Sequence, residues 1–185
     1  MGLTGKNNEE KAWNFLKGKI PNDFGVAGLM GELFAESGLN PQNLQNSYEK
    51  KLGFTDATYT AAVDSGSYAN FVHDSAGYGV AQWTFWSRKE ALLNYVRALG
   101  VSIGDLEAQL GFLYKELSES YPSVLAALKT ATSVRAASDK VLTDFERPAD
   151  QSEAVKIKRA SYGQTYYDKY AKAVASTPSE GGNNM

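Results

Sequence analysis

Carboxyl groups are the side chains of this sequence best suited to do chemistry. The 185-residue chain has no cysteine and a single histidine, His73. That composition excludes thiol nucleophiles, disulfide scaffolds and zinc sites built on paired histidines. A hydrolase with this composition would depend mainly on Asp and Glu, which can donate and accept protons as general acids and bases.

Glu36 is the first candidate among these carboxyl groups. The apolar pattern predicts a helix over residues 24–37, and a helical wheel places Glu36 at the edge of its apolar arc, with Glu32 further toward the polar side. A carboxyl group held against apolar neighbours loses hydration, which favours its protonated form and suits a general acid near neutral pH. The alternative is a solvated carboxylate at a helix end, which is the commoner situation for a Glu.

A second candidate segment follows Asp74 and reads DSAGYGVAQWT. Glycines on both sides of Tyr78 permit a tight backbone, and Gln82 and Trp83 come directly after. An amide and flat aromatic rings suit a sugar, because hydroxyl groups need directed hydrogen bonds and ring faces need stacking surfaces. The alternative is a glycine-bent turn whose aromatic side chains belong to the core.

Together, the segments GELFAESGLNP (residues 31–41) and AGYGVAQWT (76–84) resemble phage tail-associated lysozymes and endolysin muramidase domains. These belong to the wider group of goose-type lysozymes and lytic transglycosylases. The resemblance runs in order over residues 13–170 and includes three further stretches: 87–93, 109–113 and FERPAD at 145–150.

The resemblance implies a lysozyme-like fold that cleaves the β-1,4 bond between MurNAc and GlcNAc in peptidoglycan. Glu36 matches the family's catalytic acid, while Tyr78, Gln82 and Trp83 match the segment that lines the glycan cleft. Two other functions remain open. One is a lytic transglycosylase that leaves 1,6-anhydro products, and the other is a non-catalytic wall-binding tail module.

The second catalytic group is harder to assign. An inverting hydrolase needs a base about 6.5–9.5 Å from the acid, and a retaining one needs a nucleophile about 5–5.5 Å away. The goose-type pattern would place an aspartate near Thr84, which cannot serve as such a base. We therefore expect Asp74 to position the water, with Asp64 as the next alternative, although a transglycosylase mechanism needs Glu36 alone.

Other polar residues are interpreted as structural or supporting. His73 lies beside Asp74, and Glu146 lies in the stretch Glu146-Arg147-Pro148, where it could pair charges at a helix end. The aspartates of residues 56–74 lack the dense alternation of a calcium loop, so neither a metal nor another cofactor is expected.

The helical patterns predict a mainly α (α+β lysozyme-like) fold, in which two helical lobes flank a substrate cleft. Helices are expected at 8–19, 24–37, 87–99, 103–119, 123–131, 133–145 and 152–175. Residues 40–86 are rich in Gly, Ser, Asn and Tyr and predict short helices, turns and a small β-element. Residues 1–175 are expected to form the catalytic domain and 176–185 a linker-like tail.

Charge and hydropathy limit the partners. With 19 basic and 21 acidic residues the net charge is −2, which does not indicate nucleic-acid binding. No apolar run approaches the roughly 20 residues that cross a bilayer, and no signal peptide is visible. We expect glycan strands of peptidoglycan as the partner, with the chain part of a longer tail protein or an endolysin that acts at the virion tail or the cell wall.

Overall fold

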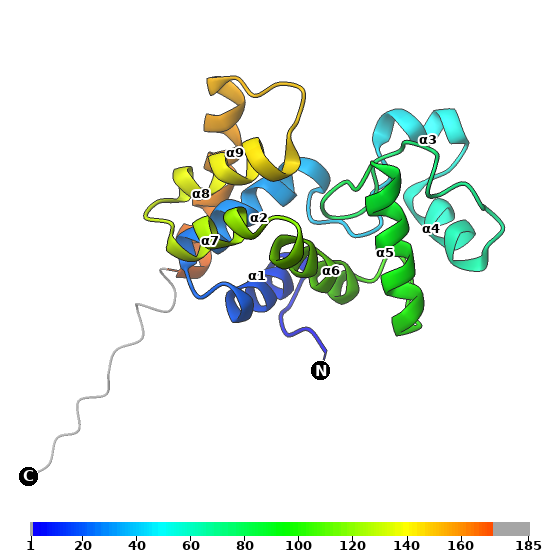
Figure 1. The fold of residues 1–185 in the computed structure, drawn as a ribbon, viewed down its shortest axis with the longest axis horizontal. Coiled ribbons are helices and arrows are strands. Elements are labelled where there is room, and N and C mark those ends of the chain that lie inside the picture. The colour runs from blue at the N-terminus through cyan, green and yellow to red at the C-terminus, as the bar shows by residue number, and fades with distance from the viewer. Residues whose placement is uncertain (1, 172–185) are drawn as a thin grey trace, which may run out of the picture.

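The computed structural model describes residues 2–171, and within them the fold is mainly helical (Figure 1). The elements are α1 (Asn8–Lys19), α2 (Asp23–Ser37), α3 (Asn46–Leu52), α4 (Asp56–Ser65), α5 (Trp86–Leu99), α6 (Leu106–Glu119), α7 (Pro122–Thr130), α8 (Val134–Val141) and α9 (Glu153–Tyr166), with π-helical turns η1 (Leu142–Glu146) and η2 (Tyr167–Ala171). The predicted tail, residues 176–185, lies outside the described residues. Within residues 2–171, no helix has the length and apolarity needed to cross a membrane.

The helices form two lobes, as the sequence predicts. Helices α3, α4 and α5 and the loops around them form the smaller lobe, α1, α2, α7, α8 and α9 form the larger one, and α6 lies between them (Figure 1). The expected β-element is limited, among the described residues, to isolated bridges that join Tyr78 to Leu44 and to Trp83. The prediction of a mainly α fold with a small irregular segment is confirmed.

Helix α2 runs through the centre of the larger lobe because three glycines let other helices approach it closely. A Cβ atom at Gly25 would lie 2.0 Å from the carbonyl oxygen of Leu128 on α7. At Gly28 it would lie 2.7 Å from the backbone of α8, and at Gly31 2.5 Å from Gly163 on α9. Contacts this close require glycine. Helix α2 is therefore buried on nearly every side, and Glu32 is fully buried rather than on a polar face.

Both ends of α2 are fixed by specific contacts. Asn22 caps the first turn by accepting hydrogen bonds from the backbone N–H groups of Phe24 and Gly25. The helix ends at Gly38 in the left-handed region (φ 63°). Ser37 Oγ donates a hydrogen bond to the carbonyl oxygen of Val80, at 2.8 Å. The last turn of α2, which carries Glu36, is therefore tied to the smaller lobe.

The later helices differ from the expected ranges at their ends. Helix α6 begins at Leu106 because Asp105 caps it, three residues later than expected. The predicted helix 133–145 is α8 followed by the π-helical turn η1. The predicted helix 152–175 is α9 followed by η2 as far as residue 171, and its last four positions lie outside the described residues. Apolar periodicity does not distinguish a π-helical turn from the α-helix that it extends.

Candidate active site

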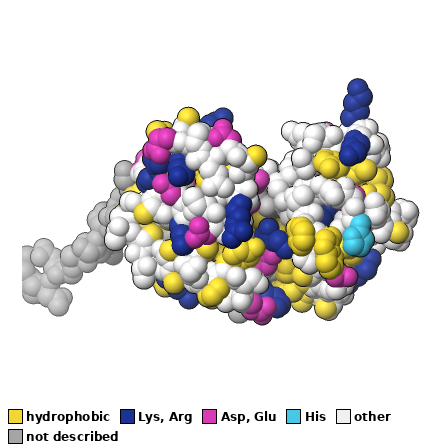
Figure 2. All heavy atoms as spheres, turned by 45° about the horizontal axis from the view of Figure 1, so that its top comes forward, with side chains coloured by type: hydrophobic (Ala, Val, Ile, Leu, Met, Phe, Trp, Pro, Cys, Tyr) yellow, Lys and Arg dark blue, Asp and Glu magenta, His cyan; other side chains and the backbone are white. Residues whose placement is uncertain are grey.

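The cleft between the lobes contains the candidate site. Its volume is about 910 Å³, and its lining comes from both lobes and the loops that join them. Figure 2 shows acidic and basic side chains gathered where the two lobes meet. The lining residues include Glu36, Gln45, Gln82, Thr84, Phe85, Arg88, Glu146 and Arg159.

Glu36 lies in this cleft at the end of α2. Its side chain is 19% exposed, and its Oε1 accepts a hydrogen bond from Arg159 Nη1 at 2.7 Å. The same Arg159 nitrogen also donates to Glu32 Oε2 at 2.8 Å, and Glu32 Oε1 accepts from Ser138 Oγ. Burial raises the pKa of Glu32, although both of these hydrogen bonds oppose the rise. Arg159 reaches both carboxyl groups because Gly31 and Gly163 let α2 and α9 cross so closely.

Glu146 is a second carboxyl group in the lining of the cleft. It ends the π-helical turn η1, and its Oε1 is buried with no hydrogen-bond partner among the described residues. Burial raises its pKa well above the usual range, and the negative charge of Glu36 adds to this effect. Arg88 and Arg159 act in the opposite direction through their charges. The cleft therefore contains two carboxyl groups in different environments, one bound to an arginine and one unpartnered.

Arg88 lines the cleft and is held in place by Glu116 and Phe145. Its Nε and Nη2 donate to the two oxygens of Glu116, at 2.8 and 2.9 Å. Glu116 Oε1 also accepts a hydrogen bond from the indole Nε1 of Trp83 at 2.7 Å. The guanidinium group lies over the ring of Phe145, the residue before Glu146. Arg88 is thereby fixed in position.

Polar groups gather around Gly77 in the cleft. A Cβ atom there would lie 2.8 Å from Gln82 Oε1, 3.2 Å from Thr84 Oγ1 and 3.3 Å from Gln45 Oε1. All of these residues line the cleft. Gln82 adopts a left-handed backbone (φ 49°), and its amide nitrogen donates to the backbone and side-chain oxygens of Asn43. Gln82 therefore lies in the lining of the cleft, and its contact with a glycan stays a prediction.

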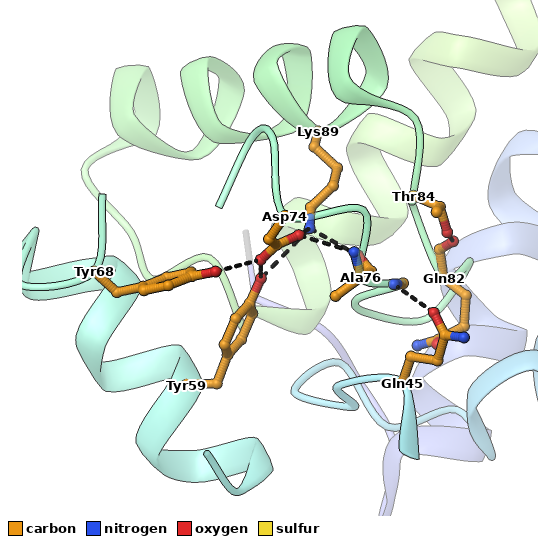
Figure 3. A network of polar contacts seen from close by, with 9 residues as sticks. Gln45, Tyr59, Tyr68, Asp74, Ala76, Gln82, Thr84 and Lys89 are labelled. Carbon is orange, nitrogen blue, oxygen red and sulfur yellow. Dashed lines mark hydrogen bonds and ion pairs between the residues drawn. The ribbon is translucent and has the colours of Figure 1, made fainter. Parts of the chain in front are cut away.

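Asp74 is placed differently from the expectation. Its side chain is fully buried in the smaller lobe and forms an ion pair with the buried Lys89, at 2.5 Å. Tyr59 and Tyr68 donate their hydroxyl protons to Asp74 Oδ2, and the backbone N–H of Ala76 donates to Oδ1 (Figure 3). Asp74 is not among the residues that line the cleft. A carboxylate enclosed by four donors cannot reach a water molecule beside a bound sugar.

The neighbours of Asp74 respond to its charge. Burial raises the pKa of the Tyr59 hydroxyl far above its ordinary value, and the hydrogen bond to Asp74 adds to the rise. Burial lowers the pKa of Lys89, while Asp74 opposes that change. These directions fit a closed ionic centre in which the tyrosines remain neutral.

Tyr78 and Trp83 also differ from the expectation that they line the glycan cleft. Both side chains are fully buried. The hydroxyl groups of Tyr78 and Thr60 are hydrogen-bonded at 2.6 Å, and the ring of Trp83 packs edge-on against Phe112. The backbone bridge between Tyr78 and Trp83 turns both rings into the core, so they support the loop that carries Gln82.

The remaining aspartate and the histidine lie outside the cleft lining. Asp64 accepts hydrogen bonds from Ser102 Oγ and from the backbone N–H of Ile103, and so fixes the chain that leads to α6. His73 is exposed, and its ring stacks on that of Trp86. Among the described residues, no cluster of His, Asp and Glu has an arrangement that could hold a metal ion.

Sequence reasoning missed several residues of the cleft, among them Arg159, Phe85 and Glu146. Arg159 and Phe85 carry no sequence signal that separates them from ordinary helix and loop residues. Glu146 did have a sequence signal, because it lies in the stretch Glu146-Arg147-Pro148. The residue before a proline is disfavoured in the α-helical region, so a turn is expected directly after Glu146. Arg147 does adopt a left-handed backbone there (φ 48°, ψ 54°).

A two-lobed, mainly α-helical fold with carboxyl groups in the interlobe cleft defines a lysozyme-like protein. A family model described as phage tail lysozyme matches residues 7–170, and the chain belongs to that family. A search of the curated proteins found no match to the chain. Membership of this family implies a peptidoglycan-lytic function, and it suggests action at the virion tail or the cell wall.

Proposed function

We propose that this protein is a muramidase that cleaves the β-1,4 bond between MurNAc and GlcNAc of peptidoglycan, with Glu36 as the proton donor. The observation that carries the proposal is the position of Glu36, at the end of a central helix and in the lining of a cleft of about 910 Å³. A cleft of this size fits sugar rings, which need walls rich in hydrogen-bonding groups.

The lining supports the binding of a glycan strand. Gln45, Gln82 and Thr84 present amide and hydroxyl groups in the lining of the cleft, close around Gly77. Phe85, at 61% exposure, offers a ring face at the edge of the same cleft. Hydroxyl and acetamido groups of a sugar can hydrogen-bond with the first set, and an apolar sugar face can stack on the ring.

Glu36 is positioned to act on the glycosidic oxygen. Its packed helix turn keeps the carboxyl group in one place, and its partial exposure leaves it open to a substrate. The hydrogen bond from Arg159 Nη1 to Oε1 holds the Glu36 carboxyl group in one orientation in the cleft. Protonation of the leaving oxygen then lets the bond to the anomeric carbon break.

Glu36→Gln tests this function. The amide keeps the size of the side chain and its ability to accept from Arg159, but it cannot act as an acid. We expect the rate of lysis of purified cell walls, followed by turbidity, to fall by about 10²–10⁴-fold. The control is Glu90→Gln, the same change at an exposed position on α5, which should lyse walls like the unchanged protein.

A non-catalytic wall-binding module is the competing interpretation, and the same assay separates the two. Binding alone leaves the turbidity of a wall suspension constant, so the unchanged protein would have no lytic rate to lose. A folded Glu36→Gln protein with full lytic activity would instead show that the acid is another group. Mass spectrometry of the released glycans decides between hydrolysis, which adds water, and transglycosylation, which leaves 1,6-anhydro ends.

A further inference from the structure

Glu146 is held in the cleft by an unusual backbone. It ends a π-helical turn, and the next residue, Arg147, adopts a left-handed conformation that is uncommon for a side chain of its size. Single π-helical turns inside helices are frequently found at functional sites. Strained residues persist only where the surrounding structure enforces them. The chain therefore maintains a costly local geometry that places Glu146 in the cleft that Glu36 also lines.

The surroundings of Glu146 do not explain it as a structural residue. Its Oε1 is buried without a hydrogen-bond partner among residues 2–171, a situation that normally lowers stability. The cations whose charges act on it, Arg88 and Arg159, donate their hydrogen bonds to Glu116, Glu32 and Glu36. A carboxyl group that contributes to folding would be expected to have one of these partners. Glu146 has a neighbouring carboxylate and the open cleft instead.

We propose that Glu146 is the second carboxyl group of the reaction, which stores the proton in the resting cleft and supplies it to Glu36. The inference rests on the proposed muramidase function. It assigns to Glu146 the part that Asp74, enclosed in the smaller lobe, is unable to take. In the resting protein Glu146 is neutral and Glu36 is the carboxylate bound to Arg159.

In each turnover of hydrolysis Glu146 gives up one proton, which ends on the leaving sugar, and regains another from water. The first proton passes from Glu146 to Glu36 through the bound substrate or a water molecule, and leaves Glu146 as a carboxylate. Glu36 donates this proton to the glycosidic oxygen as the bond from that oxygen to the anomeric carbon breaks. Glu146 then takes a proton from the water whose oxygen bonds to the anomeric carbon. Glu36 is again ionised and Glu146 is again neutral.

Four charged groups control where this proton resides. Glu32 and Glu36 on α2 favour the neutral form of Glu146, while Arg88 on α5 and Arg159 on α9 favour its carboxylate. Burial is the largest influence and favours the neutral form. A glycan strand that draws Arg159 away from Glu36 would make Glu36 the better proton acceptor, so transfer is coupled to substrate binding.

Glu146→Gln separates a chemical role from a structural one. Glutamine is neutral and has the same shape, so it imitates the resting form of Glu146 closely. A merely structural Glu146 would tolerate this change, whereas a group that releases and regains a proton would not. We expect kcat for glycan cleavage to fall by about 100-fold or more, with KM within about threefold, because the cleft keeps its shape.

The pH profile gives a second readout. In Glu146→Gln, Glu36 must take its proton from solvent, so the remaining kcat/KM should decline with rising pH from a lower pH than in the unchanged protein. Glu146→Asp retains a carboxyl group on a shorter side chain, and it should recover part of the lost kcat. Glu90→Gln again serves as the control for a lost surface charge.

The outcomes are distinct. Wild-type kcat and an unchanged pH profile in a folded Glu146→Gln protein would overturn the role of Glu146 and leave the muramidase function standing. Equal activity of the Asp and Gln variants would overturn it too, because the carboxyl group would then be irrelevant. Absence of lysis by the unchanged protein would instead remove the proposed function itself.

Discussion

Two acidic centres of this molecule, Asp74 and Glu146, differ in how their carboxyl oxygens are used. Asp74, in the smaller lobe, accepts hydrogen bonds from two tyrosines, a backbone N–H and Lys89, and its side chain has no exposed surface. Glu146, between the lobes, has a buried oxygen with no partner among the described residues, and it lines an open cleft. One carboxylate is fully satisfied and closed, and the other is unsatisfied and accessible.

This difference distinguishes a carboxyl group that stabilises the fold from one that is available to react. Completely hydrogen-bonded buried charges rigidify a region. When one partner of a buried ion pair is removed, the other charge stays buried without compensation for its lost hydration, and the protein is destabilised. A buried carboxyl group without partners lowers stability, and its retention needs another reason. The hydrogen bonds and ion pair of Asp74 join α4, α5 and the loop of residues 74–84. The same loop carries Gln82 into the cleft.

Asp74→Asn should give the largest change in stability. The substitution leaves Lys89 buried without its counter-ion, and breaking one partner of a buried pair typically lowers the free energy of unfolding by about 3–5 kcal/mol. For a chain of this size the melting temperature should fall by roughly 10 °C. Thermal denaturation followed by circular dichroism measures this, and the lytic rate of the folded variant at low temperature should stay close to wild type.

The double variant Asp74→Asn with Lys89→Met sharpens the result. It removes both charges and should recover part of the lost stability, which a double-mutant cycle expresses as a coupling energy. If Asp74→Asn kept its melting temperature but lost lytic activity, the closed centre would be catalytic, and the comparison between the two centres would fail.

The sequence predicted the fold well because the fold depends on local patterns. Apolar periodicity located most helices, and the composition of residues 40–86 indicated the irregular lobe. Glu36 could be proposed from the sequence because its position at a helix end and the surrounding family-like segment coincide. The helical wheel placed Glu32 on a polar face, because it assumes that one side of a helix is exposed to solvent. The central helix α2 has no such side at Glu32, which is fully buried.

The remaining site residues depended on contacts that local patterns do not contain. Asp74 precedes a glycine turn and has the type of side chain that a base needs, but its burial is decided by Lys89, fifteen positions later. The rings of Tyr78 and Trp83 look suited to sugars in the sequence, yet a single bridge between the two residues directs them inward. Arg159 reaches Glu36 only through the crossing of α2 and α9.

Glu146→Gln should increase stability while it lowers activity. Because burial raises the pKa of Glu146 in the folded protein, the folded state binds more protons than the unfolded state above the ordinary pKa of Glu, about 4.3. Stability therefore decreases as the pH rises from there through the folded-state pKa. The glutamine variant lacks this loss, so its melting temperature should exceed that of wild type by a few degrees near neutral pH.

Melting curves of both proteins between pH 4 and pH 8 measure this linkage. The two curves should converge toward pH 4 and below, as Glu146 becomes neutral in the folded and unfolded states alike, and separate as the pH rises. A constant difference at every pH would mean that Glu146 titrates normally. The contrast with the fully satisfied Asp74 would then lose its physical basis.

Phe85→Ala should give the smallest of these effects and should act on binding alone. Phe85 and Trp86 are adjacent exposed aromatic residues, at 61% and 48% exposure, but only Phe85 is part of the lining of the large cleft. Loss of a ring face that stacks on a sugar should weaken binding by about 0.5–1.5 kcal/mol, the scale of an aromatic contact, so KM for soluble glycan fragments should rise by roughly two- to tenfold with kcat unchanged. Trp86→Ala is the matched control, since it removes a larger exposed ring, stacked on His73, from the neighbouring position. Equal increases in KM for the two variants would show that the glycan extends over the outer face of the smaller lobe, and no increase for Phe85→Ala would place the sugar rings on the polar side of the cleft around Gly77.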